Sequence, residues 1–137
     1  MRIFIAGASG VIGVRLVPLL VADGHTVAGM TRSPQKAHML GDLGAESVVC
    51  DVFDPDDLTR AVTEFGPDVV LHQLTDLPDR AEDIPKFAER SNYMLVRGTR
   101  NLLAAAAAAH AARQTVPALD VPLGVTLVAD DRAGPPD

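Results

Sequence analysis

The chain has few of the residues that form covalent links or mark unusual environments. Its 137 residues include one cysteine, Cys50, one tyrosine and no tryptophan. A single cysteine excludes an intramolecular disulfide, and Cys50 ends an apolar run that is typical of a buried strand. We therefore predict that Cys50 is a small core residue and that the protein is cytoplasmic, where thiols stay reduced.

Positive charge and long apolar runs are also scarce. The 12 Lys and Arg residues are outnumbered by 18 Asp and Glu residues, which gives a net charge of −6 without any basic cluster. This excludes the usual electrostatic footprint for nucleic acid. The apolar stretch 3–6 is too short for a signal peptide, and no run could span a bilayer. We expect small-molecule partners, no membrane contact and no metal site.

The sequence instead alternates short apolar runs with segments of helical periodicity. Strands are predicted over residues 3–6, 26–30, 47–50 and 68–72. Helices are predicted from a glycine-rich turn to about residue 23, and over residues 34–43, 55–65 and 84–112. Continuous apolar strands alternating with helices predict an α/β fold, with a doubly wound parallel sheet covered by helices on both faces.

The domain organisation is simple. Residues 1–113 form one predicted domain. Beyond Arg113 the composition changes, because prolines and glycines punctuate residues 114–137. Within this divergent tail only residues 121–128 could supply a fifth strand.

A glycine-rich turn follows the first predicted strand. Glycines at 7, 10 and 13 would permit a tight turn, close approach of a phosphate and close helix packing, respectively. The amides of the following helix can then meet a pyrophosphate. Such glycines can also serve backbone geometry alone. The position within a repeated strand–helix alternation favours a dinucleotide site, formed by Gly7, Ala8, Ser9, Gly10, Val11, Ile12 and Gly13.

The end of the second predicted strand bears on cofactor choice. NAD sites usually place an acidic residue there, which binds the ribose 2′-hydroxyl. This chain has Thr31, Arg32 and Ser33 instead. A guanidinium can pair with a 2′-phosphate, so we predict NADP in preference to NAD, with Arg32 and Ser33 in the site. Arg32 could instead be a solvated surface charge, and Ser33 can also cap a helix.

Together with the glycine turn and Arg32, further segments resemble the extended and atypical short-chain dehydrogenase/reductase family, which includes NAD-dependent epimerase/dehydratase proteins. The resemblance includes Asp51–Val52 and residues 68–74 and 98–106, and it covers about residues 1–113. It implies a Rossmann-like NAD(P)-binding fold. It also implies that Asp51 accepts a hydrogen bond from the adenine amine, that Val52 packs near the adenine, and that the segment after the fourth strand, with Gln73 and Leu74, lines the nicotinamide ribose.

Two of these positions have plainer alternatives. Asp51 could simply cap the turn that follows the third strand. His72, near the end of an apolar strand, is better interpreted as a core or hydrogen-bonded histidine than as a catalyst.

The sequence departs from the family pattern at two places. The usual Asn before the Gly-Thr pair of the fourth helix is Leu95 here, and Asn92 lies one turn earlier. The family's catalytic Tyr-x-x-x-Lys lies beyond the fifth strand. Tyr93 and Arg97 have that spacing, but they precede the fifth strand, and arginine is not a tunable ammonium. We predict no catalytic residue in this chain.

These observations lead to a function without an identified substrate. We expect an NAD(P)-binding protein of the epimerase/dehydratase type, truncated or frame-shifted near Arg113, before the catalytic and substrate half. The alternative is a non-catalytic NADP(H)-sensing regulator or a subunit that acts through a partner chain. A homo-oligomer is compatible with either hypothesis.

Overall fold

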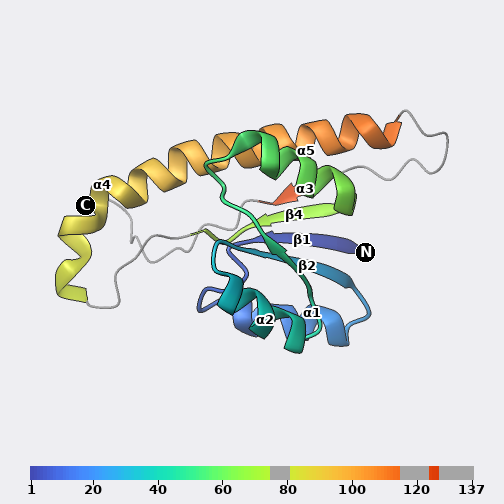
Figure 1. The fold of residues 1–137 in the computed structure, drawn as a ribbon, viewed down its shortest axis with the longest axis horizontal. Helices are drawn as coiled ribbons and strands as arrows, with labels where there is room; N and C mark the ends of the chain where they lie inside the picture. Colours follow the sequence, from blue (N-terminus) through green and yellow to red (C-terminus); the bar gives the residue numbers. More distant parts are fainter. Residues whose placement is uncertain (75–80, 115–123, 127–137) are drawn as a thin grey trace.

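A parallel sheet forms the centre of the molecule. The computed structural model describes residues 1–74, 81–114 and 124–126. Its strands lie in the order β3-β2-β1-β4-β5, and all neighbours are parallel. They are β1 (Arg2–Ala6), β2 (Thr26–Thr31), β3 (Glu46–Val49), β4 (Val69–His72) and β5 (Gly124–Thr126). The predicted α/β class is confirmed (Figure 1). β5 falls within the expected segment 121–128, whose other residues lie outside the described ones.

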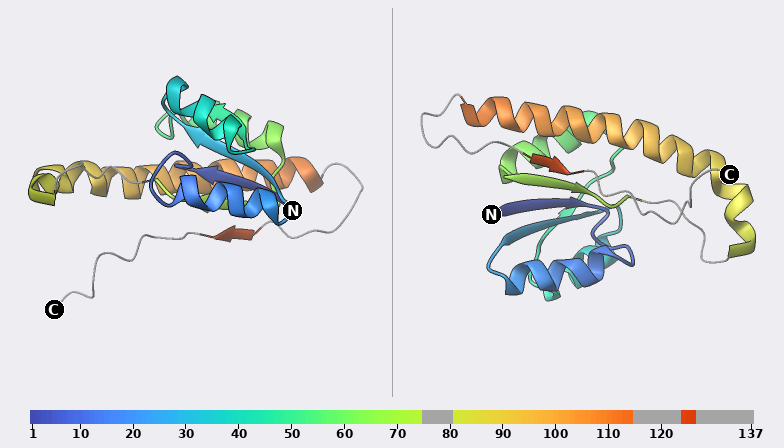
Figure 2. Two further views of the ribbon diagram at one scale, coloured as in Figure 1. Left: turned by 90° about the horizontal axis from the view of Figure 1, so that it is seen from below. Right: turned by 180° about the vertical axis from the view of Figure 1, so that it is seen from behind.

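Helices cover both faces of this sheet (Figures 1 and 2). On one side lie α1 (Gly13–Ala22) and α2 (Pro34–Asp42), and on the other lie α3 (Pro55–Phe65) and α5 (Thr99–Gln114). Strand β1 contributes to both faces because successive side chains point in opposite directions. Ile3 and Ile5 pack with Val17 of α1, whereas Phe4 packs with Leu58 and Leu102 of the other layer.

Two of the helices begin where the sequence predicts. Ser33 and Asp54 are the N-cap residues of α2 and α3, and each is followed by proline in the first turn. The Ser33 side chain accepts a hydrogen bond from the Lys36 amide, and the Asp54 carboxylate accepts one from the Asp57 amide. Proline fits here because its missing N–H would have no helical partner.

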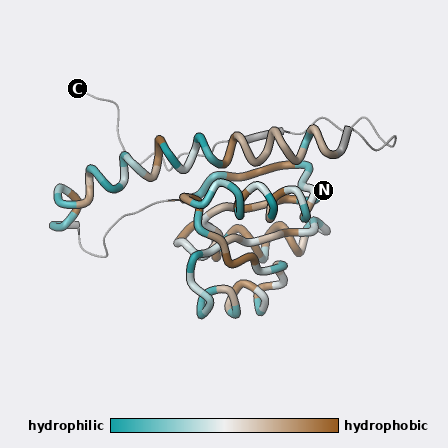
Figure 3. The backbone as a smooth tube through the Cα atoms, turned by 45° about the horizontal axis from the view of Figure 1, so that its top comes forward, coloured by the Kyte–Doolittle hydropathy of each residue, from teal (hydrophilic) through white to brown (hydrophobic). Residues whose placement is uncertain are grey.

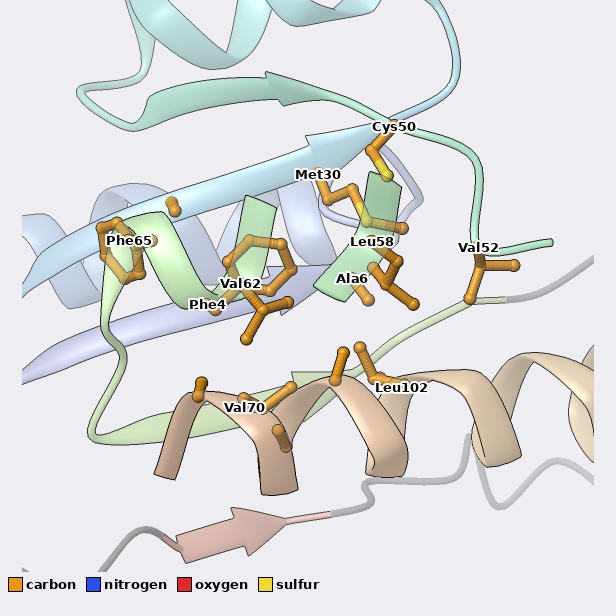
Figure 4. Close-up of a cluster of buried hydrophobic side chains, with 14 of the residues drawn as sticks. Phe4, Ala6, Met30, Cys50, Val52, Leu58, Val62, Phe65, Val70 and Leu102 are labelled. Atoms are coloured by element: carbon orange, nitrogen blue, oxygen red, sulfur yellow. The ribbon is translucent and has the colours of Figure 1, made fainter. Parts of the chain in front are cut away.

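The larger core lies between the sheet and the layer of α3 and α5 (Figure 4). Phe4, Leu58, Val70 and Leu102 are fully buried there. Cys50 is also buried, as predicted, and burial is the main cause that raises the pKa of its thiol to about 12. The thiol is therefore protonated at neutral pH and acts as a small apolar side chain.

The last long helical segment is not one regular α-helix. A 3-10 turn, η1 (Ala81–Asp83), leads into α4 (Ile84–Tyr93), and a π-helical segment, η2 (Met94–Gly98), joins α4 to α5. The sequence predicts a single helix over residues 84–112, and the wider turn in its middle is the difference. A Cβ at Gly98 would lie 3.5 Å from both Met94 Sδ and Val52 Cγ1, so the π-helical turn packs closely on the β3–α3 loop.

Hydrophobic residues are concentrated on the central strands (Figure 3). None of the helices in the described part of the chain is long and apolar enough to cross a membrane. The same residues contain no group of His, Cys, Asp and Glu side chains placed to hold a metal ion.

Candidate functional site

The predicted site residues gather at the carboxyl ends of the strands. The chain order of the strands reverses between β1 and β4, which are neighbours in the middle of the sheet. In open α/β sheets this reversal leaves a crevice at the carboxyl ends, where ligands bind. The loops after β1, β2, β3 and β4 all border this edge (Figure 1).

The glycine loop is closely packed at its two ends. Gly7 has a φ of +82°, and a Cβ there would lie 2.4 Å from the backbone oxygen of Gln73. At the other end, a Cβ on Gly13 would lie 2.3 Å from the backbone oxygen of Ala8. Neither position can accept a side chain without backbone movement. Gly7 therefore brings the loops after β1 and β4 together, and Gly13 brings α1 against the loop.

The middle of the loop, in contrast, is open. Gly10 is exposed, and among the described residues, apart from its neighbours in the chain, only the Gly7 backbone oxygen lies within 4 Å of a Cβ built there, at 3.4 Å. Helix α1 begins just beyond, without a side-chain cap and without an acidic residue in its first turn. The positive end of its dipole is thus not neutralised by its own side chains. This arrangement fits a pyrophosphate approaching the backbone at Gly10.

A buried hydroxyl links this loop to the end of β2. The Thr31 Oγ1 atom lies 3.0 Å from Ser9 Oγ and accepts a hydrogen bond from the Ser33 amide at 3.2 Å. Thr31 is 5% exposed, so these are the contacts of an interior group. Arg32, between the two bonded residues, is exposed to solvent. The backbone that carries the Arg32 guanidinium is therefore held in place relative to the glycine loop.

The loop after β3 carries Asp51 and Val52, the two residues that the family resemblance places near the adenine. Asp51 is exposed, and its carboxylate accepts a hydrogen bond from the Phe53 amide at 2.9 Å, so it does cap the local turn. That bond uses one carboxylate oxygen. Val52 is 1% exposed and belongs to the core beneath α5, so any contribution to an adenine site would come from beneath the surface. An adenine ring could not pack on it without displacing core residues.

The loop after β4 is held against the glycine loop. The backbone N–H of Gln73 donates to the backbone oxygen of Ala6 at 2.8 Å, and the residue is 8% exposed. Leu74 is partly buried, and its amide donates to His72 Nδ1 at 3.2 Å. His72 is buried and hydrogen-bonded, as the sequence predicts, and burial lowers the pKa of its imidazole.

Two residues of α5 support these loops, and neither of them is among the predicted site residues. Asn101 donates from Nδ2 to the backbone oxygen of Val52 at 2.9 Å, and Thr99 Oγ1 lies 2.9 Å from His72 Nε2. Both stand in the segment 98–106 that carries the resemblance. The sequence does hold a signal for such a role. Thr99 and Asn101 are polar residues shortly before a run of alanines, on a helix that otherwise packs through apolar side chains.

Tyr93, which with Arg97 matches the spacing of the family's catalytic pair by chance, is not placed for catalysis. Tyr93 is 57% exposed, and its ring lies 5.2 Å, between centroids, from that of Phe53. Arg97, four residues on, is exposed as well. Leu95 and Asn92, at and near the position of the family's usual Asn, also lie on the exposed side of the helical segment. The described residues therefore hold no tyrosine–lysine pair.

The sheet order, the glycine loop and the uncompensated start of α1 together define a Rossmann-type dinucleotide-binding domain. The sequence model of the NAD(P)H-binding family matches residues 7–120. The chain belongs to this family, within the extended and atypical short-chain dehydrogenases/reductases that include the NAD-dependent epimerases.

Individual relatives are consistent with that assignment. The chain is 35% identical, over 134 residues, to a 3-diazoavenalumate denitrifying reductase from Streptomyces, and the match covers 96% of this chain and 43% of that protein. It is 36% identical to a UDP-glucose 4-epimerase from Mycolicibacterium smegmatis, covering 77% of this chain and 34% of the epimerase.

The solved structures give the same fold. The UDP-glucose 4-epimerase of Thermus thermophilus in complex with NAD superposes with a TM-score of 0.65 at 27% identity, covering 80% of this chain and 35% of the epimerase. In all three comparisons the chain spans less than half the length of the protein it matches.

Proposed function

We propose that this chain binds NADP(H) in preference to NAD(H), as the cofactor domain of a reductase-type or epimerase-type protein. The observation that carries the preference is Arg32, which is exposed at the end of β2, where NAD sites place a carboxylate. No carboxylate of the described residues forms an ion pair with it. Its guanidinium is therefore available for charge-assisted hydrogen bonds to a 2′-phosphate.

The other loops suggest how the rest of the cofactor would be held. The open backbone at Gly10 and the amides of α1 would bind the pyrophosphate, and the exposed Asp51 carboxylate would accept the adenine amine. Gln73 and Leu74 would border the nicotinamide ribose. A bound nicotinamide supplies hydride transfer, whereas the protein supplies binding and orientation. Val52 would support the adenine end only from below, as a core residue.

Turnover would require residues beyond those that this chain places at the site. The only tyrosine, Tyr93, is exposed on the outer helix, and the residue at the lysine position is Arg97. We propose that the chain alone binds the cofactor without a complete proton-transfer pair, which leaves catalysis to a partner chain or to additional sequence. Cytoplasmic location stays a prediction from the composition.

A role as a subunit or sensor is the second candidate, and one surface favours it. Tyr93 at the end of α4 and Leu95 and Val96 of η2 are each more than half exposed. Clustered exposed apolar side chains are typical of interaction surfaces. Light scattering coupled to size exclusion, with and without NADPH, tests this role. A monomer at every concentration would contradict a homo-oligomer.

Calorimetric titration with NADPH and NADH tests the main proposal. We expect tighter binding of NADPH, and Arg32→Ala should weaken NADPH about tenfold to a hundredfold while changing NADH little, because charged hydrogen bonds contribute about 1.5–3 kcal/mol. Gly10→Val should abolish binding of both. The control is Arg60→Ala. It removes an exposed arginine that pairs with Asp57 on α3, which covers the face of the sheet opposite to α1 and α2.

Two results would contradict the proposal in different ways. Equal or tighter binding of NADH by the wild type would refute the preference for NADP. Failure of the folded wild type to bind either nucleotide would refute the cofactor role itself. An equal loss in Arg60→Ala and Arg32→Ala would show that only the overall charge matters.

A further inference from the structure

His72 connects three parts of the molecule at the end of β4. It is 5% exposed and lies in register with Ala6 at the end of β1. Both of its ring nitrogens have partners. Nδ1 lies 3.2 Å from the amide nitrogen of Leu74, and Nε2 lies 2.9 Å from Thr99 Oγ1 at the start of α5.

These partners determine the protonation of the ring. A backbone amide can only donate a hydrogen bond, so Nδ1 must be the acceptor and cannot carry a proton. In the neutral ring the hydrogen then resides on Nε2, which donates to the Thr99 hydroxyl. A protonated ring would carry hydrogen on both nitrogens and would lose the bond from Leu74. The neutral Nε2–H tautomer therefore satisfies both contacts of the ring.

The bond from Leu74 fixes a backbone segment that borders the glycine loop. The intervening residue, Gln73, donates to the Ala6 backbone oxygen at 2.8 Å, and its own carbonyl occupies the space where a Gly7 Cβ would lie. His72 thus holds residues 73 and 74 from one side while β1 holds them from the other. Thr99 in turn fixes the ring to α5, which packs beside α3 on one face of the sheet.

We propose that His72, as the neutral Nε2–H tautomer, is a positioning residue for the cofactor site: it couples Thr99 of α5 to the backbone at Gln73 and Leu74. This inference rests on the proposed function, because that backbone is the predicted border of the nicotinamide ribose. Under the proposed function the adenine half of the cofactor would lie toward β2 and β3, so His72 should affect the nicotinamide half alone. A merely structural histidine would stabilise the fold without affecting either half selectively.

The test compares two ligands on variants of the hydrogen-bonding partner. Thr99→Val removes the hydroxyl with little change of shape, and Thr99→Ser restores it. The ligands are NADPH and 2′,5′-ADP, which lacks the nicotinamide ribose. We expect Thr99→Val to weaken NADPH about fivefold to tenfold, as expected for one lost hydrogen bond, with unchanged affinity for 2′,5′-ADP. Thr99→Ser should bind both as the wild type does.

A second variant separates the two bonds of the ring. In His72→Asn the side-chain oxygen can approach the former Nδ1 position and accept from Leu74, but it does not reach Thr99. We expect its NADPH affinity to match that of Thr99→Val. Equal affinities for NADPH in wild type and Thr99→Val would overturn the inference, as would equal losses for the two ligands.

Nitrogen NMR of the His72 ring gives a readout that needs no cofactor. The wild type at pH 8 should show the Nε2–H tautomer. A ring protonated on Nδ1 would overturn the positioning role of His72 but would leave the proposed function intact. If the folded wild type bound neither NADPH nor 2′,5′-ADP, the proposed function would be overturned, and the positioning role with it. The two failures are therefore distinguishable.

Discussion

The two halves of the candidate site are built in different ways. On the β1–β2 side, the glycine loop, Thr31 and Arg32 all come from the first 33 residues and are held by backbone packing and one buried hydroxyl. On the β3–β4 side, the two loops are held by α5. Asn101 is 49 residues from Val52, and Thr99 is 27 residues from His72. The first half is local in sequence apart from the contact of Gly7 with Gln73, whereas the second depends in addition on the packing of α5.

This difference sets what a substitution can do on each side. A change in the glycine loop collides with backbone that cannot move independently, so its effect is steric and large. A change in α5 removes one hydrogen bond from a loop that retains its other contacts, so its effect is smaller. Substitutions on the two sides should therefore differ in the size of their effect.

Gly7→Ala should give the largest loss of stability. Its φ of +82° disfavours any side chain, and the Cβ would meet the Gln73 carbonyl at 2.4 Å. We expect a free energy of unfolding lower by about 3 kcal/mol or more, from backbone strain and overpacking together. Urea denaturation measures it. Gly24→Ala is the matched control, because Gly24 has a φ of +88° but a Cβ there would meet no other part of the described chain within 4 Å, and the variant should lose about 1–2 kcal/mol. Equal losses would show that packing against β4 is unimportant.

Thr31→Val should come next, at about 1–3 kcal/mol, because it leaves the Ser33 amide and the Ser9 hydroxyl without their buried partner. The fold should persist, since the side-chain shape is nearly kept. Thr31→Ser retains the hydroxyl and should recover most of the stability. Thermal unfolding with and without NADPH measures both variants. A Thr31→Val protein as stable as the wild type would show that the two loops are held independently of this hydroxyl.

Asn101→Ala should cost about 1 kcal/mol, because it removes one bond to the Val52 carbonyl while alanine favours the helix. The control is Asn92→Ala, an exposed asparagine of α4, for which a change within about 0.5 kcal/mol is expected. Chemical denaturation of both variants under one set of conditions makes the comparison. A loss in Asn92→Ala as large as in Asn101→Ala would refute the assigned contact.

The smallest expected effect is a pH dependence from His72. Burial lowers the pKa of its imidazole below the usual 6.5, so the unfolded chain binds a proton more readily than the folded protein. The contribution is fully present above pH 6.5 and is lost as the pH falls from there through the folded pKa. Urea midpoints from pH 8 to pH 5 should therefore fall more in the wild type than in His72→Asn. Parallel profiles would contradict this assignment.

Much of the fold could be predicted because its signals are local. Ser33 and Asp54, each followed by proline, predict the starts of two helices, and the apolar runs between turns predict the strands. The glycine loop could be placed for the same reason. Arg32 could be located at the end of β2, but its ligand stays a prediction.

What the sequence did not reveal depends on packing between distant segments. The burial of Val52 follows from the position of α5 above it, which no local pattern contains. The roles of Thr99 and Asn101 depend equally on where that helix lies. The π-helical turn at Met94–Gly98 also escaped prediction, since its residues are ordinary helix formers apart from Gly98. These features all belong to the β3–β4 half of the site.

The strand order has a consequence for the chain as it is synthesised. Strand β1 lies in the middle of the sheet, but one of its two neighbours, β4, ends only at His72. The ribosome therefore releases β1 and β2 well before the second edge of β1 can be covered. During that interval an apolar strand presents free amide and carbonyl groups, which other nascent chains can pair with. Slower translation before β4 has emerged from the ribosome should thus increase aggregation, whereas a pause after its emergence should not.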